Sequence, residues 1–339
     1  MNLGLVYIAF SFLASIGCSP SHDDGQPQEV QVVKVKKYQN PIIQTSLPDP
    51  TIVKASDGYF YLYATENIRN LPIYRSRDLV DWQYVGTVFT DETRPQWNPK
   101  GSLWAPDINY VDGKYLLYYS KSEWGGEWTC GIGVASATSP AGPFTDHGAL
   151  FISENIGVRN SIDPFYMEEN GKKYVFWGSF HGIYGIELTT DGLAIKPGSK
   201  PVQVAADQME ATYIHKRGKY YYLFGSAGTC CEGANSTYRV VYGRSEHLFG
   251  PYVTKDGKNM LDGAFDVLIH GSSSVAGPGH NAEFITDNKG QDWIIYHGFA
   301  MKDPDAGRLV YMDKVDWIND WPQVAGNMPS VESSRPVFE

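Results

Sequence analysis

The chain has 339 residues with a formal net charge of −10; 42% of the residues are hydrophobic and 14% are aromatic. This composition is that of an ordinary folded protein with one large domain or two medium ones. No Lys/Arg-rich block offsets the negative charge, which argues against nucleic acid as a partner. The 35 glycines and 20 prolines, with so many aromatics, favour short strands and turns over helices.

The N-terminus carries a predicted export signal, residues 1–18, followed by a polar tether, residues 19–38. The run from Leu3 to Gly17 is apolar but too short for a comfortable membrane span. Its end, LASIGC, is similar to a bacterial lipobox, in which the cysteine, here Cys18, becomes the lipidated first residue. No Lys or Arg precedes the apolar run, so a plain cleaved secretory signal is the alternative.

We therefore expect an exported bacterial protein whose only membrane contact is an N-terminal lipid on Cys18. The lipid would anchor it to the outer membrane, on the periplasmic or the cell-surface side, and the polar tether would hold the folded part away. If the lipobox interpretation fails, we expect a periplasmic protein.

The rest of the chain repeats one local pattern five times. Each unit has an acid, a short strand, a turn with glycine, and a second strand rich in Tyr, Phe or Trp. The five acids are Asp49, Asp107, Asp163, Glu210 and Glu283, and the turn glycines are Gly58, Gly113, Gly171, Gly218 and Gly290. A period of about 50 to 70 residues with a hairpin in every unit is typical of a β-propeller.

The predicted fold is therefore all-β, a five-bladed β-propeller over residues 39–339, with the active site at one mouth of the central channel. An irregular β-sandwich is the alternative. In a propeller the first strand of each blade lines the channel, so the alignment places all five acids in a ring at one mouth. Carboxylates that converge in this way repel one another, and this lowers stability unless a function uses them.

A ring of acids suits three kinds of site. Two carboxyls across a cleft suit glycoside hydrolysis, in which one gives a proton to the leaving oxygen and the other activates water. Carboxylates also bind calcium, which takes six to eight oxygen ligands. In the third case the acids simply pair with Lys and Arg. Sugar rings pack on aromatic side chains, and Trp104 is the best candidate for this because it precedes Asp107 at the start of a blade.

From about residue 40 to the C-terminus, four segments in order resemble glycoside hydrolase family 43. LPDPTIV is similar to the first-blade segment, which implies that Asp49 is the general base. NSIDPFY is similar to the third-blade segment, which implies that Asp163 modulates the pKa of the acid. The segment starting MEATYIHK implies that Glu210 is the general acid. LWAPDINY implies that Trp104 and Asp107 lie near the sugar.

Three further segments are similar to the arabinanase branch of that family. GTCCEGANSTYRV matches its loop after the acid, although the residues leave open whether Cys230 and Cys231 form a disulfide. GPGHNAEF implies that His280 reaches the channel axis and contacts a bound metal, usually calcium, largely through water. GRLVYMDKVDW implies that Arg308 contacts the modulating Asp163.

The resemblance implies an inverting hydrolase of α-L-arabinofuranosyl linkages in plant arabinan or arabinan side chains, either an endo-1,5-arabinanase or an exo-arabinofuranosidase. No cofactor is required for the chemistry; a structural calcium in the channel is expected as an option. The Trp-rich segment SKSEWGGEWTCG favours exo action, whereas the Cys-Cys-x-Gly loop favours endo action. Alternatives are a β-xylosidase or another furanosidase, such as a galactofuranosidase, and a non-catalytic carbohydrate-binding lipoprotein.

Overall fold

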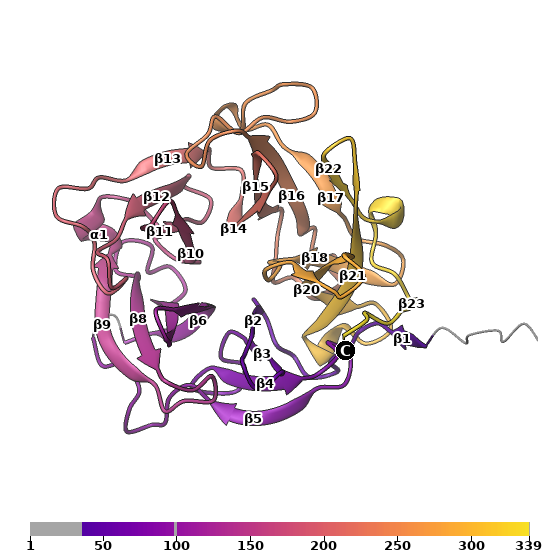
Figure 1. Ribbon diagram of the computed structural model, residues 1–339, viewed down its shortest axis with the longest axis horizontal. Helices are drawn as coiled ribbons and strands as arrows, with labels where there is room; N and C mark the ends of the chain where they lie inside the picture. Colours follow the sequence, from indigo (N-terminus) through magenta and orange to yellow (C-terminus); the bar gives the residue numbers. More distant parts are fainter. Residues whose placement is uncertain (1–35, 98–99, 339) are drawn as a thin grey trace, which may run out of the picture. The chain divides into compact units, whose positions relative to one another are not determined.

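The computed structural model describes residues 36–97 and 100–338 of the chain. Five antiparallel β-sheets stand around a central axis in chain order, so the predicted all-β, five-bladed propeller is confirmed (Figure 1). The predicted signal, Cys18 and most of the tether lie outside the described residues. Within the described ranges, no helix combines the length and apolarity needed to cross a membrane.

In each blade the strands lie side by side, and their order in the chain leads outward from the axis. The first contains β2 (Thr51–Lys54), β3 (Phe60–Tyr63), β4 (Pro72–Ser76) and β5 (Gln83–Thr87). The second contains β6 (Ser102–Val111), β7 (Lys114–Ser122), β8 (Gly131–Ala137) and β9 (Thr145–Ile152). The third contains β10 (Phe165–Glu169), β11 (Lys172–Trp177), β12 (Ile183–Glu187) and β13 (Val202–Ala205).

The last two blades follow the same plan with longer excursions between strands. The fourth contains β14 (Glu210–Arg217), β15 (Tyr220–Ala227), β16 (Arg239–Ser245) and β17 (Asp266–Ile269). The fifth contains β18 (Val275–Gly279), β19 (Ile285–Thr286), β20 (Asp292–Ala300), β21 (Arg308–Ile318) and β22 (Trp321–Gln323). Short helical turns are α1 (Ser153–Ile156), η1 (Gly233–Asn235), η2 (Met260–Asp262), η3 (Pro304–Ala306) and η4 (Ala325–Asn327).

The first described residues close the ring against the last blade. Strand β1 (Lys37–Gln39) pairs with β23 (Glu332–Ser334), and the Tyr38 hydroxyl donates to the Met312 carbonyl at 2.6 Å. A single bridge joins Ile43 to Val310 on β21. The chain therefore crosses the fifth blade before it enters the first, and this ties the two blades together.

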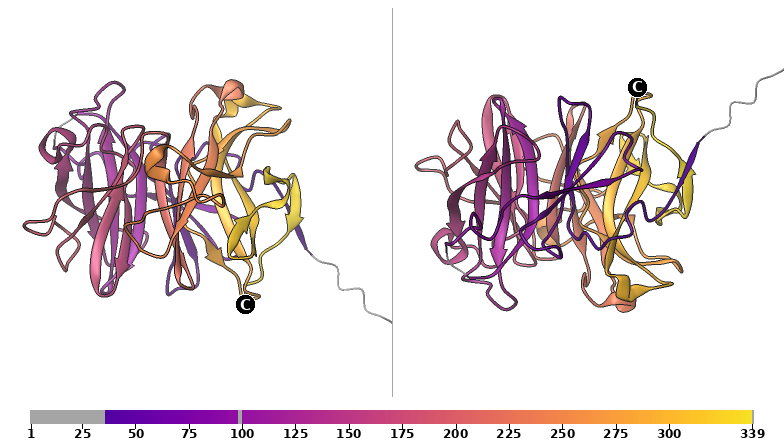
Figure 2. Two further views of the ribbon diagram at one scale, coloured as in Figure 1. Left: turned by 90° about the horizontal axis from the view of Figure 1, so that it is seen from above. Right: turned by 90° about the horizontal axis from the view of Figure 1, so that it is seen from below.

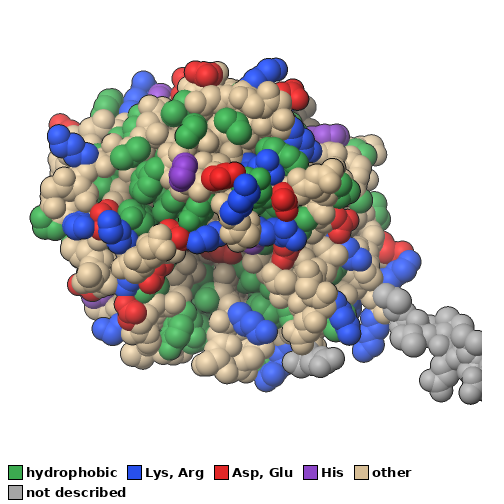
Figure 3. Space-filling view, turned by 45° about the horizontal axis from the view of Figure 1, so that its top comes forward, with side chains coloured by type: hydrophobic (Ala, Val, Ile, Leu, Met, Phe, Trp, Pro, Cys, Tyr) green, Lys and Arg blue, Asp and Glu red, His purple; other side chains and the backbone are tan. Residues whose placement is uncertain are grey.

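The hydrophobic core lies between the blades. Four clusters of buried side chains each combine residues of neighbouring blades, and they contain the large, fully buried Tyr63, Trp177 and Trp293. The side views show the blades edge-on, with strands running from one face of the ring to the other (Figure 2). On the face shown in Figure 3, acidic and basic side chains are interspersed, without a large patch of either sign.

Each blade has one residue near the axis with a left-handed backbone conformation, which lies shortly before the first strand, inside it, or, in the fifth blade, directly after β18. These blade-start residues, with their φ angles, are Asp49 (55°), Ala105 (39°), Asp163 (58°), Ala211 (60°) and His280 (47°). A positive φ is unfavourable for a residue with a Cβ atom, and such residues are enriched at functional sites. The five positions lie at equivalent places in the repeat, and three of them carry titratable side chains.

Candidate active site

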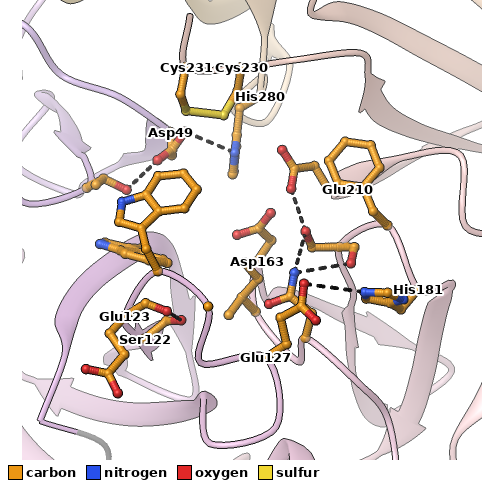
Figure 4. A pocket seen from close by; sticks show the side chains of 18 of the residues that line it. Asp49, Ser122, Glu123, Glu127, Asp163, His181, Glu210, Cys230, Cys231 and His280 are labelled. Carbon is orange, nitrogen blue, oxygen red and sulfur yellow. Dashed lines mark hydrogen bonds and ion pairs between the residues drawn. A yellow bond between two sulfur atoms is a disulfide. The ribbon is translucent and has the colours of Figure 1, made fainter.

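A cavity of about 360 Å³ opens among the blade-start residues. Six of the residues expected from the sequence line it: Asp49, Trp104, Asp163, Glu210, His280 and Arg308. In Figure 4, Asp49 and Glu210 face each other across the cavity, with Asp163 between them. All three carboxyl side chains are buried.

Asp49 is held as an ionised carboxylate. Its Oδ1 accepts from Arg308 Nη1 at 2.9 Å and lies 3.2 Å from His280 Nδ1, while its Oδ2 accepts from the Thr65 hydroxyl at 2.5 Å. Burial alone raises the pKa of Asp49, but Arg308 and His280 outweigh it and hold the pKa well below its usual range. An ionised carboxylate suits a base that takes a proton from water.

Asp163 and Glu210 have the opposite tendency. Burial raises the pKa of Asp163 to about 8; the charges of Glu210 and Asp49 add to this effect, while His280 opposes it. Burial also raises the pKa of Glu210, although hydrogen bonds from Ser179 and Tyr238 act against it. Two close carboxyls in a buried site do not readily ionise together, so the pair retains a proton at neutral pH.

Hydroxyl groups hold Glu210 at the start of β14. The Ser179 hydroxyl donates to Oε2 at 2.6 Å, and the Tyr238 hydroxyl donates to Oε1 at 2.7 Å. The Asp163 amide donates to the Ser120 hydroxyl at 2.8 Å, which fixes the backbone that carries this acid. The cavity thus combines one ionised carboxylate with a proton-retaining pair, as acid–base cleavage of a glycosidic bond requires.

The comparison with known proteins identifies the family. The family model described as "Glycosyl hydrolases family 43" matches residues 38–322. The chain belongs to glycosyl hydrolases family 43. It is therefore a glycosidase by family, and the resemblance noted in the sequence is confirmed.

Relatives within family 43 have arabinan-degrading names. The chain is 35% identical over 292 residues to the extracellular endo-α-(1→5)-L-arabinanase 1 of Bacillus subtilis, covering 81% of this chain and 87% of that enzyme. It is 32% identical over 311 residues to the extracellular exo-α-(1→5)-L-arabinofuranosidase ArbA of Cellvibrio japonicus, covering 83% and 87%. The solved α-L-arabinanase of Cellvibrio cellulosa with arabinohexaose has a TM-score of 0.76 at 32% identity, covering 83% and 96%.

The prediction that Arg308 contacts Asp163 was wrong. Its guanidinium contacts Asp49 rather than Asp163. The reason is the backbone pairing around Arg308. Its carbonyl accepts from the Leu47 amide at 3.0 Å, and its amide donates to the Ser46 hydroxyl at 3.1 Å. Because the start of β21 lies against the segment that leads into Asp49, the guanidinium reaches the Asp49 carboxylate.

The expected ring of five acids was also wrong. Asp107 does not line the cavity; it accepts from the Tyr166 amide at 2.7 Å and lies beside Glu283. Burial and the charge of Glu283 raise the pKa of Asp107. The left-handed residues of the second and fifth blades are Ala105 and His280. Asp107 and Glu283 come two and three residues after them, so their side chains do not occupy the position that Asp49 and Asp163 hold in their blades.

His280 contacts Asp49, and protein side chains do not supply a complete ligand set for the metal expected beside it within the described ranges. The described ranges contain no group of three or more His, Cys, Asp or Glu side chains that could hold a metal ion. Calcium takes six to eight oxygen ligands. An ion contacting the His280 imidazole would therefore keep most of its water.

Two apolar groups form part of the cavity wall. The rings of Trp104 and Trp124 pack at a centroid distance of 5.7 Å, and Trp124 is 82% exposed. Cys230 and Cys231 form a disulfide that lines the cavity, which resolves the alternatives left open by the sequence (Figure 4). Both surfaces are apolar walls against which a sugar ring can pack.

The hydroxyl groups that position the acids were not predicted from the sequence. Thr65, Ser120 and Ser179 close the second-strand segments YLYAT, YLLYYS and YVFWGS of their units. A hydroxyl at the same place in successive repeats was a readable signal. Tyr238 lacked this signal, because it lies just before β16, the third strand of the fourth blade, and not at the end of a second strand.

The pKa shifts predict a bell-shaped dependence of kcat/KM on pH. Asp49 must be ionised, and its lowered pKa keeps activity high until the pH falls below the usual carboxylate range. The Asp163–Glu210 pair must keep its proton, so activity falls as the pH rises through about 8. Initial rates from pH 3 to 10 check this; an alkaline limb at pH 5 or below would contradict a proton-retaining pair.

Proposed function

We propose that the protein is an inverting glycoside hydrolase that cleaves α-L-arabinofuranosyl linkages in plant arabinan or arabinan side chains. The observation that carries the proposal is the meeting of Asp49, Asp163 and Glu210 in one cavity with opposite pKa shifts. The sugar assignment rests on relatives named for arabinan linkages.

The proposed reaction is a single displacement. Asp49 removes a proton from a water molecule, which attacks the anomeric carbon from the side opposite the leaving group. Glu210 donates its proton to the departing glycosidic oxygen. Asp163 helps to keep that proton in the pair, while the hydroxyls of Ser179 and Tyr238 aim the Glu210 carboxyl. No covalent bond to the protein forms.

Arg308 supports the base rather than the modulating acid. Its positive charge stabilises the ionised form of Asp49 and orients Oδ1. Once Asp49 is protonated during the reaction, the same charge disfavours that state, so the proton passes readily to solvent or product. No cofactor takes part in these steps.

A second hollow favours internal cleavage. It has a volume of about 620 Å³ and shares Trp104, Glu123 and Trp124 with the catalytic cavity. A polymer bound in the cavity can continue over the exposed Trp124 ring into this hollow. That path supports an open groove with sugar contacts on both sides of Trp124.

The product profile on linear 1,5-arabinan tests the proposal. A spread of oligosaccharides at early times, separated by chain length, is expected for internal cleavage. Arabinose alone, with the polymer hardly shortened, would instead identify an exo-acting arabinofuranosidase. If linear and branched arabinan both stay intact while a xyloside or galactofuranoside is cleaved, the sugar assignment is wrong and the alternative furanosidase or xylosidase function takes its place.

We also propose export, with a lipid on Cys18 and residues 19–38 as a tether for a catalytic domain over residues 39–339. The two relatives described above are named extracellular, which supports export but leaves the lipid to be tested. Metabolic labelling with a radioactive fatty acid, lost in Cys18→Ser, checks the anchor. A hydrated calcium at His280 is a further proposal, checked by the metal content of the purified protein.

A further inference from the structure

Side chains at the end of the second strands hold the blade-start residues of the next blades. Thr65 accepts a hydrogen bond from the Ala105 amide at 2.7 Å, and Ser120 accepts one from the Asp163 amide at 2.8 Å. Ser226 accepts one from the His280 amide at 2.8 Å. Ser179, at this place in the third blade, uses its hydroxyl for Glu210 instead.

The fifth blade uses a histidine where the others use a hydroxyl. Nδ1 of His297, on β20, accepts from the Asp49 amide at 3.0 Å. The imidazole thus holds the left-handed backbone of the base, whose φ is 55°. Nδ1 lies one bond further from the main chain than a serine or threonine hydroxyl, so the histidine bridges a longer span where the last blade meets the first.

The rest of the imidazole links the base to the acid. His297 is fully buried, and its ring stacks on Tyr238 at a centroid distance of 5.8 Å and an interplanar angle of 12°. The hydroxyl of Tyr238 donates to Glu210. One side chain therefore contacts the backbone of Asp49 and the ring that aims Glu210.

The other ring nitrogen points to a functional reason for this histidine. Because Nδ1 accepts a hydrogen bond, the neutral ring carries its proton on Nε2. That atom is buried and has no hydrogen-bonding partner among residues 36–97 and 100–338. A buried donor without a partner destabilises a fold, and each such group in a native structure requires an explanation.

We propose that His297 is a positioning residue for this reaction: it keeps Asp49 and Glu210 aligned across the cavity. The proposal rests on the proposed hydrolase function. Its essential group is the acceptor at the Nδ1 position, and its effect is on the geometry of the base and the acid rather than on sugar binding.

Three variants and one control test the role of the acceptor. Asparagine places its oxygen near the Nδ1 position, glutamine places its oxygen near Nε2, and leucine has nearly the shape of asparagine without any acceptor. The control is Tyr296→Phe, on the same strand as His297, which removes a buried 2.6 Å hydrogen bond to Asp313 on β21; neither residue lines the cavity. Each variant is assayed for kcat and KM on arabinan and for its melting temperature.

We expect His297→Leu to lower kcat by about 100-fold with KM within about threefold, because small misplacements of reacting groups cost about this much. His297→Asn should stay within about tenfold of the wild type, His297→Gln should resemble His297→Leu, and Tyr296→Phe should lower the melting temperature alone. If His297→Leu does not fold, the ratio of kcat between His297→Asn and His297→Gln decides in its place.

Equal kcat in the asparagine and glutamine variants, or wild-type kcat in a folded leucine variant, would overturn the proposal. A rise in KM without loss of kcat would do the same, since it would place His297 in substrate binding. Failure of the proposed function looks different, because the wild-type protein itself would then leave arabinan intact.

Discussion

Glu210→Gln is expected to lower kcat on arabinan by about 10²–10⁴-fold, the usual contribution of a positioned general acid. The amide keeps the shape of the carboxyl and can still contact Ser179 and Tyr238, but it has no proton to give to the leaving oxygen. Binding of arabino-oligosaccharides should survive. Steady-state rates and calorimetric binding to the same variant measure the two effects separately.

The nature of the leaving group supplies an internal control for Glu210. An aryl arabinofuranoside with an acidic phenol departs without protonation, so the variant should lose much less activity on it than on arabinan. Glu246→Gln makes the same chemical change in an exposed ion pair with Lys219 and should leave both activities unchanged. Full activity of Glu210→Gln on arabinan would remove Glu210 from the mechanism.

Asp49→Asn is expected to reduce kcat by at least about 10³-fold, within the range for loss of a catalytic base. An amide cannot accept the proton of the attacking water. The change also leaves the largely buried Arg308 guanidinium without its counter-charge, so the melting temperature should fall. Rates on arabinan and thermal unfolding of the same preparation measure both effects.

Azide distinguishes loss of the base from damage to the cavity. It attacks without needing to lose a proton, so it should restore turnover of an activated aryl substrate by Asp49→Asn and give an arabinosyl azide of inverted configuration. Asp81→Asn, in an exposed ion pair with Arg335, is the matched control and should keep wild-type activity. An azide product of retained configuration would argue against single displacement.

The meeting of Asp49, Asp163 and Glu210 in one cavity could be predicted because the signals that mark these residues are local. Asp49, Asp163 and Glu210 each stand at the start of a hairpin with a glycine turn and an aromatic second strand. Each hairpin forms within about 20 residues of chain, so its place in the repeat can be read directly. The same hairpin pattern placed Asp107 and Glu283 in the ring of acids by mistake, because similar hairpins start at different distances along the chain from the left-handed residue.

Contacts between blades could not be predicted from the hairpin pattern. Arg308 and Asp49 are separated by 259 positions, His297 and Asp49 by 248, and Ser120 and Asp163 by 43. Which of them meet depends on how one blade docks against the next and on where the first meets the last. A change of two residues in this offset moves a side chain to another neighbour: Asp107 comes two residues after the left-handed Ala105, whereas Asp163 is itself the left-handed residue.

The five-fold hairpin repeat, the propeller, the family and the three acids that share the cavity could all be predicted from the sequence, since these depend on short-range strand and turn patterns. Three contacts became visible only in the folded chain: Arg308 pairs with Asp49, Asp107 and Glu283 lie outside the cavity, and His297 accepts from the Asp49 amide. The physical reason is that charge pairing, burial and hydrogen-bond partners are set by packing across blades, and packing determines which carboxyl keeps its proton.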